Sequence, residues 1–258
     1  MRPLHGPVSG LLAALLGSQS LACGPLRMAY YEYPGLYERQ PGGAEVGFEV
    51  DLRSAMEERS GCRLEPVYLS SKRAWLDMAE ARMDLMASAL QTPERARKFD
   101  FLLFARTRAL LLIPKPVPAG LGSREAFEAS KARVMIVRGT SYTPRVSAWL
   151  ERLRAQGRVS EAGDMPSALR AFGVGRAEAL LIYPMALVGR ETDWLERHQL
   201  QDWWPEETAY GGWALNRQTV SAADRQRLRE AAESLRADGT LQRLGRRHFG
   251  PLAVHMLK

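Results

Sequence analysis

The sequence predicts an α/β protein built from two successive units of alternating strands and helices. From Leu26 the chain follows the order strand, helix, strand, helix, strand within about 65 residues, which is typical of a parallel sheet with covered faces. The run KPVPAG at residues 115–120 interrupts this alternation, which then restarts. A chain of 258 residues is long enough for two lobes.

Short apolar runs indicate the strands. LRMAYYEY begins the first strand and continues into an aromatic loop, where Pro34 and Gly35 mark a turn. RVMIV and ALLIY are apolar throughout, as expected of strands buried on both faces. The predicted strands begin at residue 26 and span 64–69, 84–89, 109–113, 133–137, 179–183 and 211–217.

Apolar residues at helical spacing and terminal signals indicate the helices. Gly61 stands where a left-handed C-cap is needed, and Thr143 with Pro144 provides an N-cap and a first helical residue. Ser123, Asp164 and Ser221 begin further helices in the same way. The predicted helices span residues 47–61, 73–81, 123–129, 143–157, 164–172, 221–239 and 240–249.

The first 22 residues indicate a secretory signal peptide. Arg2 precedes an apolar run at 8–17, and small residues stand three before and one before a cut after Ala22. A short core helix is the alternative, but the segment lacks capping and amphipathic spacing. A lipid anchor at Cys23 is a further alternative, which Ser20 disfavours because a leucine usually stands three residues before a lipidated cysteine.

Cys23 and Cys62 are the two cysteines of the sequence. In an exported chain such a pair favours one disulfide over two unrelated thiols. The bridge would close a loop of about 40 residues and stabilise the fold by roughly 4 kcal/mol in the chain-entropy model.

The charge pattern and the motif content exclude several classes of function. The net charge is +7, but the basic residues are mixed with acidic ones and form no tract interleaved with aromatics, so a nucleic-acid partner is not expected. The four histidines have no metal-ligand spacing, and we find no phosphate-binding loop or nucleophile elbow. We therefore expect no metal and no cofactor.

Five motifs stand in the order and spacing of one family. They are GFEVDL at 47–52, TPER at 92–95 followed by Phe99, VRGTSY at 137–142, GRAEA at 175–179, and ADGT at 237–240 with HFG at 248–250. Together they resemble the periplasmic solute-binding proteins of polar-amino-acid ABC transporters, solute-binding protein family 3. The resemblance covers about residues 26–250.

The resemblance implies a two-lobed, type II periplasmic-binding-protein-like fold in which each lobe is a mostly parallel sheet flanked by helices. Lobe one would combine residues 24–108 with 209–258, and lobe two would span 109–208. The lobes would close by hinge rotation on a small-molecule ligand, like a Venus flytrap. The protein would be a periplasmic monomer that delivers its ligand to an inner-membrane ABC permease.

The resemblance also implies which residues bind the ligand. Arg95 matches the residue that grips a ligand carboxylate, and its planar guanidinium fits that group. Ser88 and Thr92 match positions that supply hydroxyl or amide contacts, and Ser141 matches an amide donor from lobe two. The aromatic loop, with Tyr30, Tyr31, Tyr33 and Tyr37, matches the region that contacts the ligand side chain, although some of these rings would simply pack the lobe.

Two departures from the family pattern bear on the ligand. Tyr183 stands where amino-acid binders usually hold an aspartate for the α-ammonium group, and a phenol cannot replace that counter-ion. Glu32 is a candidate substitute from lobe one. The stretch from Asp84 to Arg95 is also one residue shorter than usual. An organic anion, a modified amino acid or a peptide fragment is therefore an alternative to a standard amino acid.

Two other functions remain open. Cyclohexadienyl dehydratases resemble these binders and need an acid or base beside the bound carboxylate, for which Glu32, Glu178 and Asp84 are available. Because Glu178 and Asp84 fit structural positions better, we expect no enzyme. An orphan or sensory binding module needs the same cleft as a transport protein, and the sequence does not separate the two.

Overall fold

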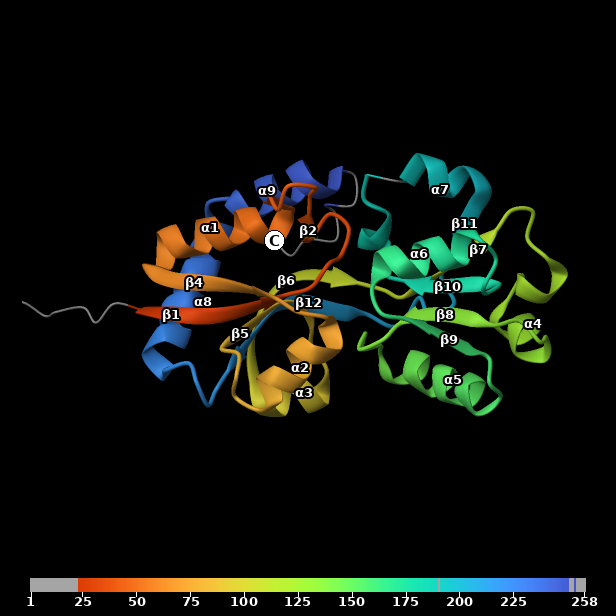
Figure 1. Cartoon of the computed structure of the whole chain (residues 1–258), viewed down its shortest axis with the longest axis horizontal. Helices are drawn as coiled ribbons and strands as arrows, with labels where there is room; N and C mark the ends of the chain where they lie inside the picture. Colours follow the sequence, from red (N-terminus) through yellow and green to blue (C-terminus); the bar gives the residue numbers. More distant parts are fainter. Residues whose placement is uncertain (1–22, 190, 251–252, 254–258) are drawn as a thin grey trace, which may run out of the picture.

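A computed structural model describes residues 23–189, 191–250 and 253. The predicted signal peptide at 1–22 lies outside these residues. Two five-stranded sheets dominate the fold, and each carries helices on its faces (Figure 1). Within the described residues, no helix is both long and apolar enough to span a bilayer.

The first sheet has the strand order β4-β1-β5-β12-β6 and forms what we call the first lobe. Four strands run in one direction, and β12 lies antiparallel between β5 and β6. Helices α1 and α9 lie on one face, and α2 and α3 lie on the other (Figure 1). The elements are β1 (Cys23–Tyr30), β2 (Glu38–Arg39), β3 (Glu45–Val46), α1 (Phe48–Ser60), β4 (Cys62–Tyr68), α2 (Ser71–Ala79), β5 (Leu85–Leu90), α3 (Pro93–Lys98), β6 (Phe99–Thr107), β12 (Ala209–Asn216), α8 (Ala222–Ala237) and α9 (Thr240–Phe249).

The second sheet has the order β11-β7-β10-β8-β9 and forms the second lobe. Here too four strands share a direction, and β7 is the reversed one. Helices α6 and α5 cover opposite faces (Figure 1). The elements are β7 (Leu110–Pro114), η1 (Ala119–Leu121), α4 (Arg124–Ala129), β8 (Val134–Val137), α5 (Pro144–Ala155), β9 (Val159–Ala162), α6 (Met165–Gly173), β10 (Ala179–Ile182), η2 (Pro184–Leu187), α7 (Glu191–Arg197) and β11 (His198–Gln201).

The chain passes between the two sheets twice. Residues 108–109 join β6 to β7, and residues 202–208 join β11 to β12. An ion pair of 2.8 Å between Arg108 Nη1 and Asp202 Oδ2 ties the two crossings together. The two-lobed fold with mostly parallel sheets is thus as expected. We propose that the lobe boundaries follow these crossings, at 24–108 with 209–258 and at 109–208.

Most helix termini follow the local chemistry of the sequence. Gly61 ends α1 with a φ of 66°, and the side chain of Asp164 caps α6 by accepting a hydrogen bond from the amide of Ser167. The N-cap residue and the first helical residue of α5 are also as expected. Thr143 is the N-cap and Pro144 the first helical residue, although the Thr143 hydroxyl makes no capping hydrogen bond.

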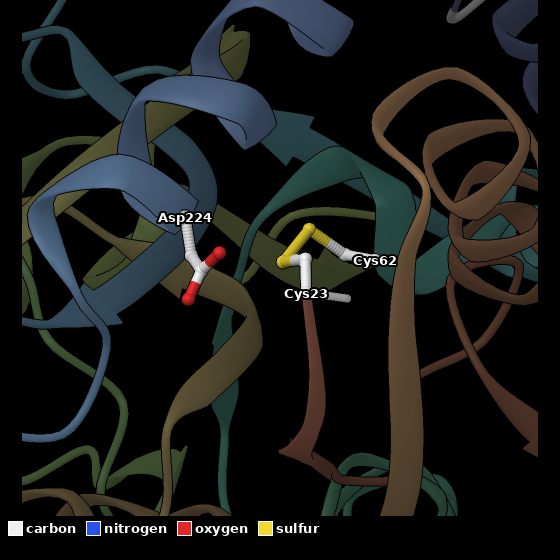
Figure 2. Close-up of side chains that lie close together, drawn as sticks. All are labelled: Cys23, Cys62 and Asp224. Atoms are coloured by element: carbon white, nitrogen blue, oxygen red, sulfur yellow. A yellow bond between two sulfur atoms is a disulfide. The ribbon is translucent and has the colours of Figure 1, made fainter. Parts of the chain in front are cut away.

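Cys23 and Cys62 form the expected disulfide, which joins the first residues of β1 and β4 where these strands pair (Figure 2). The carboxylate of Asp224, on α8, lies beside the bridge (Figure 2). Within the part of the chain that the structure describes, these three side chains are the one cluster with metal-ligand spacing. Both sulfurs are bonded to each other, so neither is the thiolate that a metal would need.

Candidate functional site

Two openings that share part of their walls lie between the lobes beside Arg95. The smaller, which we call the inner cavity, has a volume of about 80 Å³. Its wall consists of Tyr31, Glu32, Tyr33, Tyr68–Ser71, Trp75, Ser88, Leu90 and Arg95 from the first lobe, and of Val137, Gly139–Ser141, Gly163–Met165 and Tyr183 from the second. Side chains from both lobes therefore enclose one space.

The larger opening, which we call the outer groove, has a volume of about 800 Å³. It is lined by Trp75, Ala79, 90–95 and 97–99 from the first lobe, by Ile136, 140–144, Ser147, Leu150, Glu151, Arg154 and Tyr183 from the second, and by Thr208–Tyr210. Arg95, Ser141 and Tyr183 line both openings and so mark the boundary between them.

Arg95 is positioned by the short helix α3. The hydroxyl of Thr92 caps this helix by accepting a hydrogen bond of 3.2 Å from the amide of Arg95. The guanidinium donates to the carbonyl of Leu90 at 3.0 Å, and its carbon lies 3.6 Å from the centre of the Trp75 ring. These contacts hold the side chain at the mouth of the inner cavity.

The guanidinium of Arg95 is partly desolvated and forms no ion pair with a described carboxylate. Among the described residues, no carboxylate oxygen lies within 4.0 Å of it. Burial lowers the pKa of Arg95 to about 10, which still leaves the group positively charged at neutral pH. Partial burial of a cation without an ion-pair partner is unfavourable, and an incoming carboxylate would relieve that cost.

Ser88 lies at the inner cavity, but its donors are already engaged. Its amide and its hydroxyl donate to Glu49 Oε1 at 2.9 and 2.7 Å, and its φ is 50°. Trp213 donates to the other oxygen of Glu49 at 2.6 Å, and Tyr31 donates to the Ser88 carbonyl at 2.7 Å. Ser88 therefore fixes the end of β5 as part of a buried network.

Glu49 is the centre of this network and was not expected as a site residue. It is the third residue of the GFEVDL motif and is 2% exposed. Burial raises its pKa, and the three hydrogen bonds that it accepts oppose the rise. The motif could have pointed to Glu49, but its partners come from strands far away in the sequence.

Tyr183 follows β10 and is buried between the lobes. Its hydroxyl donates to the carbonyl of Ser141 at 2.9 Å, and its ring stacks on Tyr142 with the centroids 5.9 Å apart. The backbone carbonyl of Tyr183 accepts a hydrogen bond of 3.3 Å from Tyr33. Burial raises the pKa of Tyr183 well above its usual value, so the side chain is a neutral donor and offers no charge to an ammonium group.

The amide of Ser141 remains available to a ligand. In the described part of the chain it donates no hydrogen bond to a protein acceptor. Ser141 belongs to the second lobe, whereas Arg95 belongs to the first, and both line the inner cavity. A carboxylate at this position could accept hydrogen bonds from both lobes at once.

Two carboxylates line the inner cavity. Glu32 accepts a hydrogen bond of 3.4 Å from the hydroxyl of Tyr68. Asp164 accepts a hydrogen bond of 2.7 Å from the amide of Ser167. Neither forms an ion pair within 4.0 Å with a described cationic side chain. The sequence indicated Asp164 only as the start of a helix, and its place in the cavity depends on how the lobes meet.

The other two carboxylates considered for acid–base chemistry lie elsewhere. Asp84 is buried, and its carboxylate accepts a hydrogen bond of 2.7 Å from the amide of Arg27. Glu178 accepts a hydrogen bond of 2.7 Å from the amide of Arg133. Neither residue lines either opening, so both have the structural role that the sequence favoured.

The aromatic loop divides between site and core. Tyr31 and Tyr33 line the inner cavity. Tyr30 and Tyr37 are each 1% exposed and pack against each other inside the first lobe. Trp75 and Tyr68 complete the wall, and no sequence signal distinguished them from ordinary helix and strand residues.

The fold and the cavity between its lobes define a two-lobed ligand-binding protein. The chain belongs to the bacterial extracellular solute-binding proteins, family 3, whose model matches residues 26–251. A comparison with curated proteins finds no match.

Solved structures share the fold at low sequence identity. The substrate-binding protein of an ABC uptake transporter from Streptococcus pneumoniae, solved with bound histidine, is 19% identical, with a TM-score of 0.74 over 87% of this chain and 92% of its own. A histidine kinase sensor domain is 17% identical, with a TM-score of 0.72 over 92% and 99%. AncCDT-1, an ancestral amino-acid-binding protein and precursor of cyclohexadienyl dehydratase, is 19% identical, with a TM-score of 0.70 over 87% and 94%.

Proposed function

We propose that this chain is an exported solute-binding protein that captures a small carboxylate-bearing ligand, an amino acid or a related organic anion, between its lobes. The observation that carries this proposal is the guanidinium of Arg95. It is partly desolvated, lacks a carboxylate partner among the described residues, and faces the cavity. A ligand carboxylate matches its planar fork of donors.

The same carboxylate would couple binding to closure of the lobes. Arg95 and the amide of Ser141 belong to different lobes and line the same cavity. A ligand that accepts hydrogen bonds from both favours the closed arrangement by its differential affinity for it. Thr92 supports the site by holding α3, and Tyr31, Tyr33 and Tyr183 form its walls.

The membership of the chain in this family supports a role in uptake. On this proposal the protein acts as a monomer in the periplasm and docks on an inner-membrane ABC permease. The sensor-domain neighbour represents the second role, ligand sensing without transport. Genes for a permease and an ATPase beside the gene for this chain would favour uptake, and their absence would favour sensing.

We propose binding without catalysis, and one observation keeps an enzyme as the second candidate. Glu32 and Asp164 lie in the same cavity as Arg95, so an acid or base does stand near the proposed carboxylate site. Incubation of the purified protein with prephenate or arogenate decides this point. Formation of an aromatic product would establish a dehydratase, and unchanged substrate would leave the binding function.

A thermal-shift screen tests the proposed function. The screen would compare amino acids, amines, dicarboxylates and aromatic acids at equal concentration. A ligand at 100 times its dissociation constant should raise the free energy of unfolding by about 2.7 kcal/mol. We expect hits among the carboxylates and none among amines that lack a carboxylate. Amine hits without carboxylate hits would contradict the proposal.

A further inference from the structure

The inner cavity contains charged side chains of both signs at different places in its wall. Arg95 lines the inner cavity and the outer groove, whereas Glu32, Tyr68 and Asp164 line the inner cavity alone. The two carboxylates therefore lie at the end away from the outer groove. Among the described residues, neither lies within 4.0 Å of Arg95 or of another cationic side chain.

The hydroxyl of Tyr68 lies in the field of both carboxylates. This hydroxyl donates to Glu32 at 3.4 Å. Burial raises the pKa of Tyr68, and the negative charges of Glu32 and Asp164 raise it further, so both carboxylates act on this hydroxyl. Arg39 lies over the Tyr68 ring at 5.2 Å, but it does not line the cavity.

These like charges come from different lobes. Glu32 belongs to the first lobe and Asp164 to the second, and both face one cavity of about 80 Å³. Two carboxylates that face one cavity repel each other, and this repulsion opposes closure of the lobes. A ligand cation between them would reverse the sign of that interaction.

The position usually used for an ammonium group is not available. Tyr183 occupies it, and the hydroxyl of Tyr183 donates a hydrogen bond to the carbonyl of Ser141. A cationic nitrogen directly beside a carboxylate bound at Arg95 therefore finds no counter-ion there. The nearest uncompensated negative charge in the cavity wall comes from Glu32 and Asp164.

The size of the inner cavity sets how much of a ligand fits between Arg95 and the two carboxylates. One buried water needs about 10–15 Å³ on this measure of volume, so the inner cavity has room for roughly five to eight waters. A ligand of about that many non-hydrogen atoms would fill it. An unbranched chain of four or five carbons with a charge at each end is of this size.

We propose that Glu32 and Asp164 form a cation subsite, and that the ligand is a small ω-amino acid whose ammonium group is separated from its carboxylate by several carbons. This inference rests on the proposed function, because Arg95 must hold the carboxylate. It goes beyond that function by naming the charge separation that the cavity selects.

Calorimetric titrations of the full chain test the inference with defined probes. 4-Aminobutyrate and 5-aminopentanoate would be compared with butanoate and pentanoate, which lack the amine, and with 2-aminobutyrate, which carries it on the α-carbon. We expect one of the two ω-amino acids to bind at least tenfold more tightly than its amine-free analogue and than 2-aminobutyrate.

Two conservative variants assign this preference to the subsite. Glu32→Gln keeps an acceptor for Tyr68, and Asp164→Asn keeps an N-cap for α6. In each variant we expect the affinity for the ω-amino acid to fall at least tenfold and the affinity for the amine-free analogue to stay unchanged. A thermal melt of each variant confirms that it folds.

Three outcomes of these titrations would overturn the inference. If neither ω-amino acid binds, if 2-aminobutyrate binds more tightly, or if the preference survives in both variants, the cation subsite is wrong.

Arg95→Ala separates this failure from failure of the proposed function. If butanoate binding depends on Arg95 but shows no amine preference, the proposed function stands and the inference falls. If carboxylates bind equally well to Arg95→Ala, both fall.

Discussion

The hydroxyl of Tyr33, in the first lobe, donates a hydrogen bond of 3.3 Å to the backbone carbonyl of Tyr183, in the second. The lobes also meet at two glycines. A Cβ on Gly35 would lie 2.7 Å from Val188 Cγ1, and a Cβ on Gly139 would lie 3.0 Å from the amide nitrogen of Lys72. At these points the two lobes are in close contact beside the inner cavity.

Removal of the Tyr33 hydroxyl should favour a more open protein. One hydrogen bond contributes about 0.5–1.5 kcal/mol, which corresponds to a change of roughly 2- to 12-fold in the ratio of closed to open molecules. We expect Tyr33→Phe to increase the radius of gyration in small-angle X-ray scattering. Tyr31→Phe is the matched control, because it loses a hydrogen bond within the first lobe. Equal scattering from Tyr33→Phe and the wild type would contradict the role of this bond.

A side chain at Gly139 should also hinder closure. Gly139 has a φ of 85°, so alanine there adds backbone strain of about 1–2 kcal/mol as well as the clash with Lys72. Gly157→Ala carries the same kind of strain at a φ of 68° and has no neighbour within 4 Å. Both variants should melt at lower temperature, but only Gly139→Ala should scatter as a more open particle. The same opening in Gly157→Ala would show that strain, not the contact, is responsible.

Loss of the disulfide should destabilise the protein strongly. The bridge joins Cys23 and Cys62 across 39 positions, for which the chain-entropy model gives about 4 kcal/mol. Cys23→Ser with Cys62→Ser should lower the free energy of urea unfolding by that order, and a reductant should have the same effect on the wild type alone. A double variant as stable as the oxidised wild type would contradict this expectation.

Glu49 should make stability depend on pH. Burial raises its pKa above the ordinary 4.5, so the folded state binds this proton more tightly than the unfolded state does. The resulting stabilisation is complete below about 4.5 and is lost as the pH rises through the folded pKa. Glu49→Gln cannot bind this proton. Its free energy of unfolding, relative to that of the wild type at the same pH, should therefore increase as the pH rises from about 4 to 7. A difference that does not vary with pH would contradict the raised pKa.

Local patterns predicted the parts of the fold whose residues carry their own signal. The apolar runs of β8 and β10 are fully buried, and the caps at Gly61 and Asp164 use the chemistry of single residues. Strand β6 was not predicted, because its burial pattern is irregular and its neighbour β12 is more than 100 residues away. Strand β11 is polar and only partly buried, so it has no periodic signal.

Motif spacing led to two of the residues that line the inner cavity. Arg95 and Tyr183 were found in this way, and both line the inner cavity. Trp75 and Asp164 were not, because their place in the wall depends on the packing of α2 against α3 and of one lobe against the other. Such contacts have no counterpart in the local sequence.

The central claim is that Arg95 holds a ligand carboxylate. Calorimetry with the carboxylate that gives the largest thermal shift, on the wild type, Arg95→Ala and Arg97→Ala, tests it most directly. Arg97 lies on the same helix and lines the outer groove, but it is exposed and does not line the inner cavity, so its variant controls for the loss of one positive charge. We expect Arg95→Ala to lose binding while Arg97→Ala keeps it. Normal binding by a folded Arg95→Ala would contradict the claim.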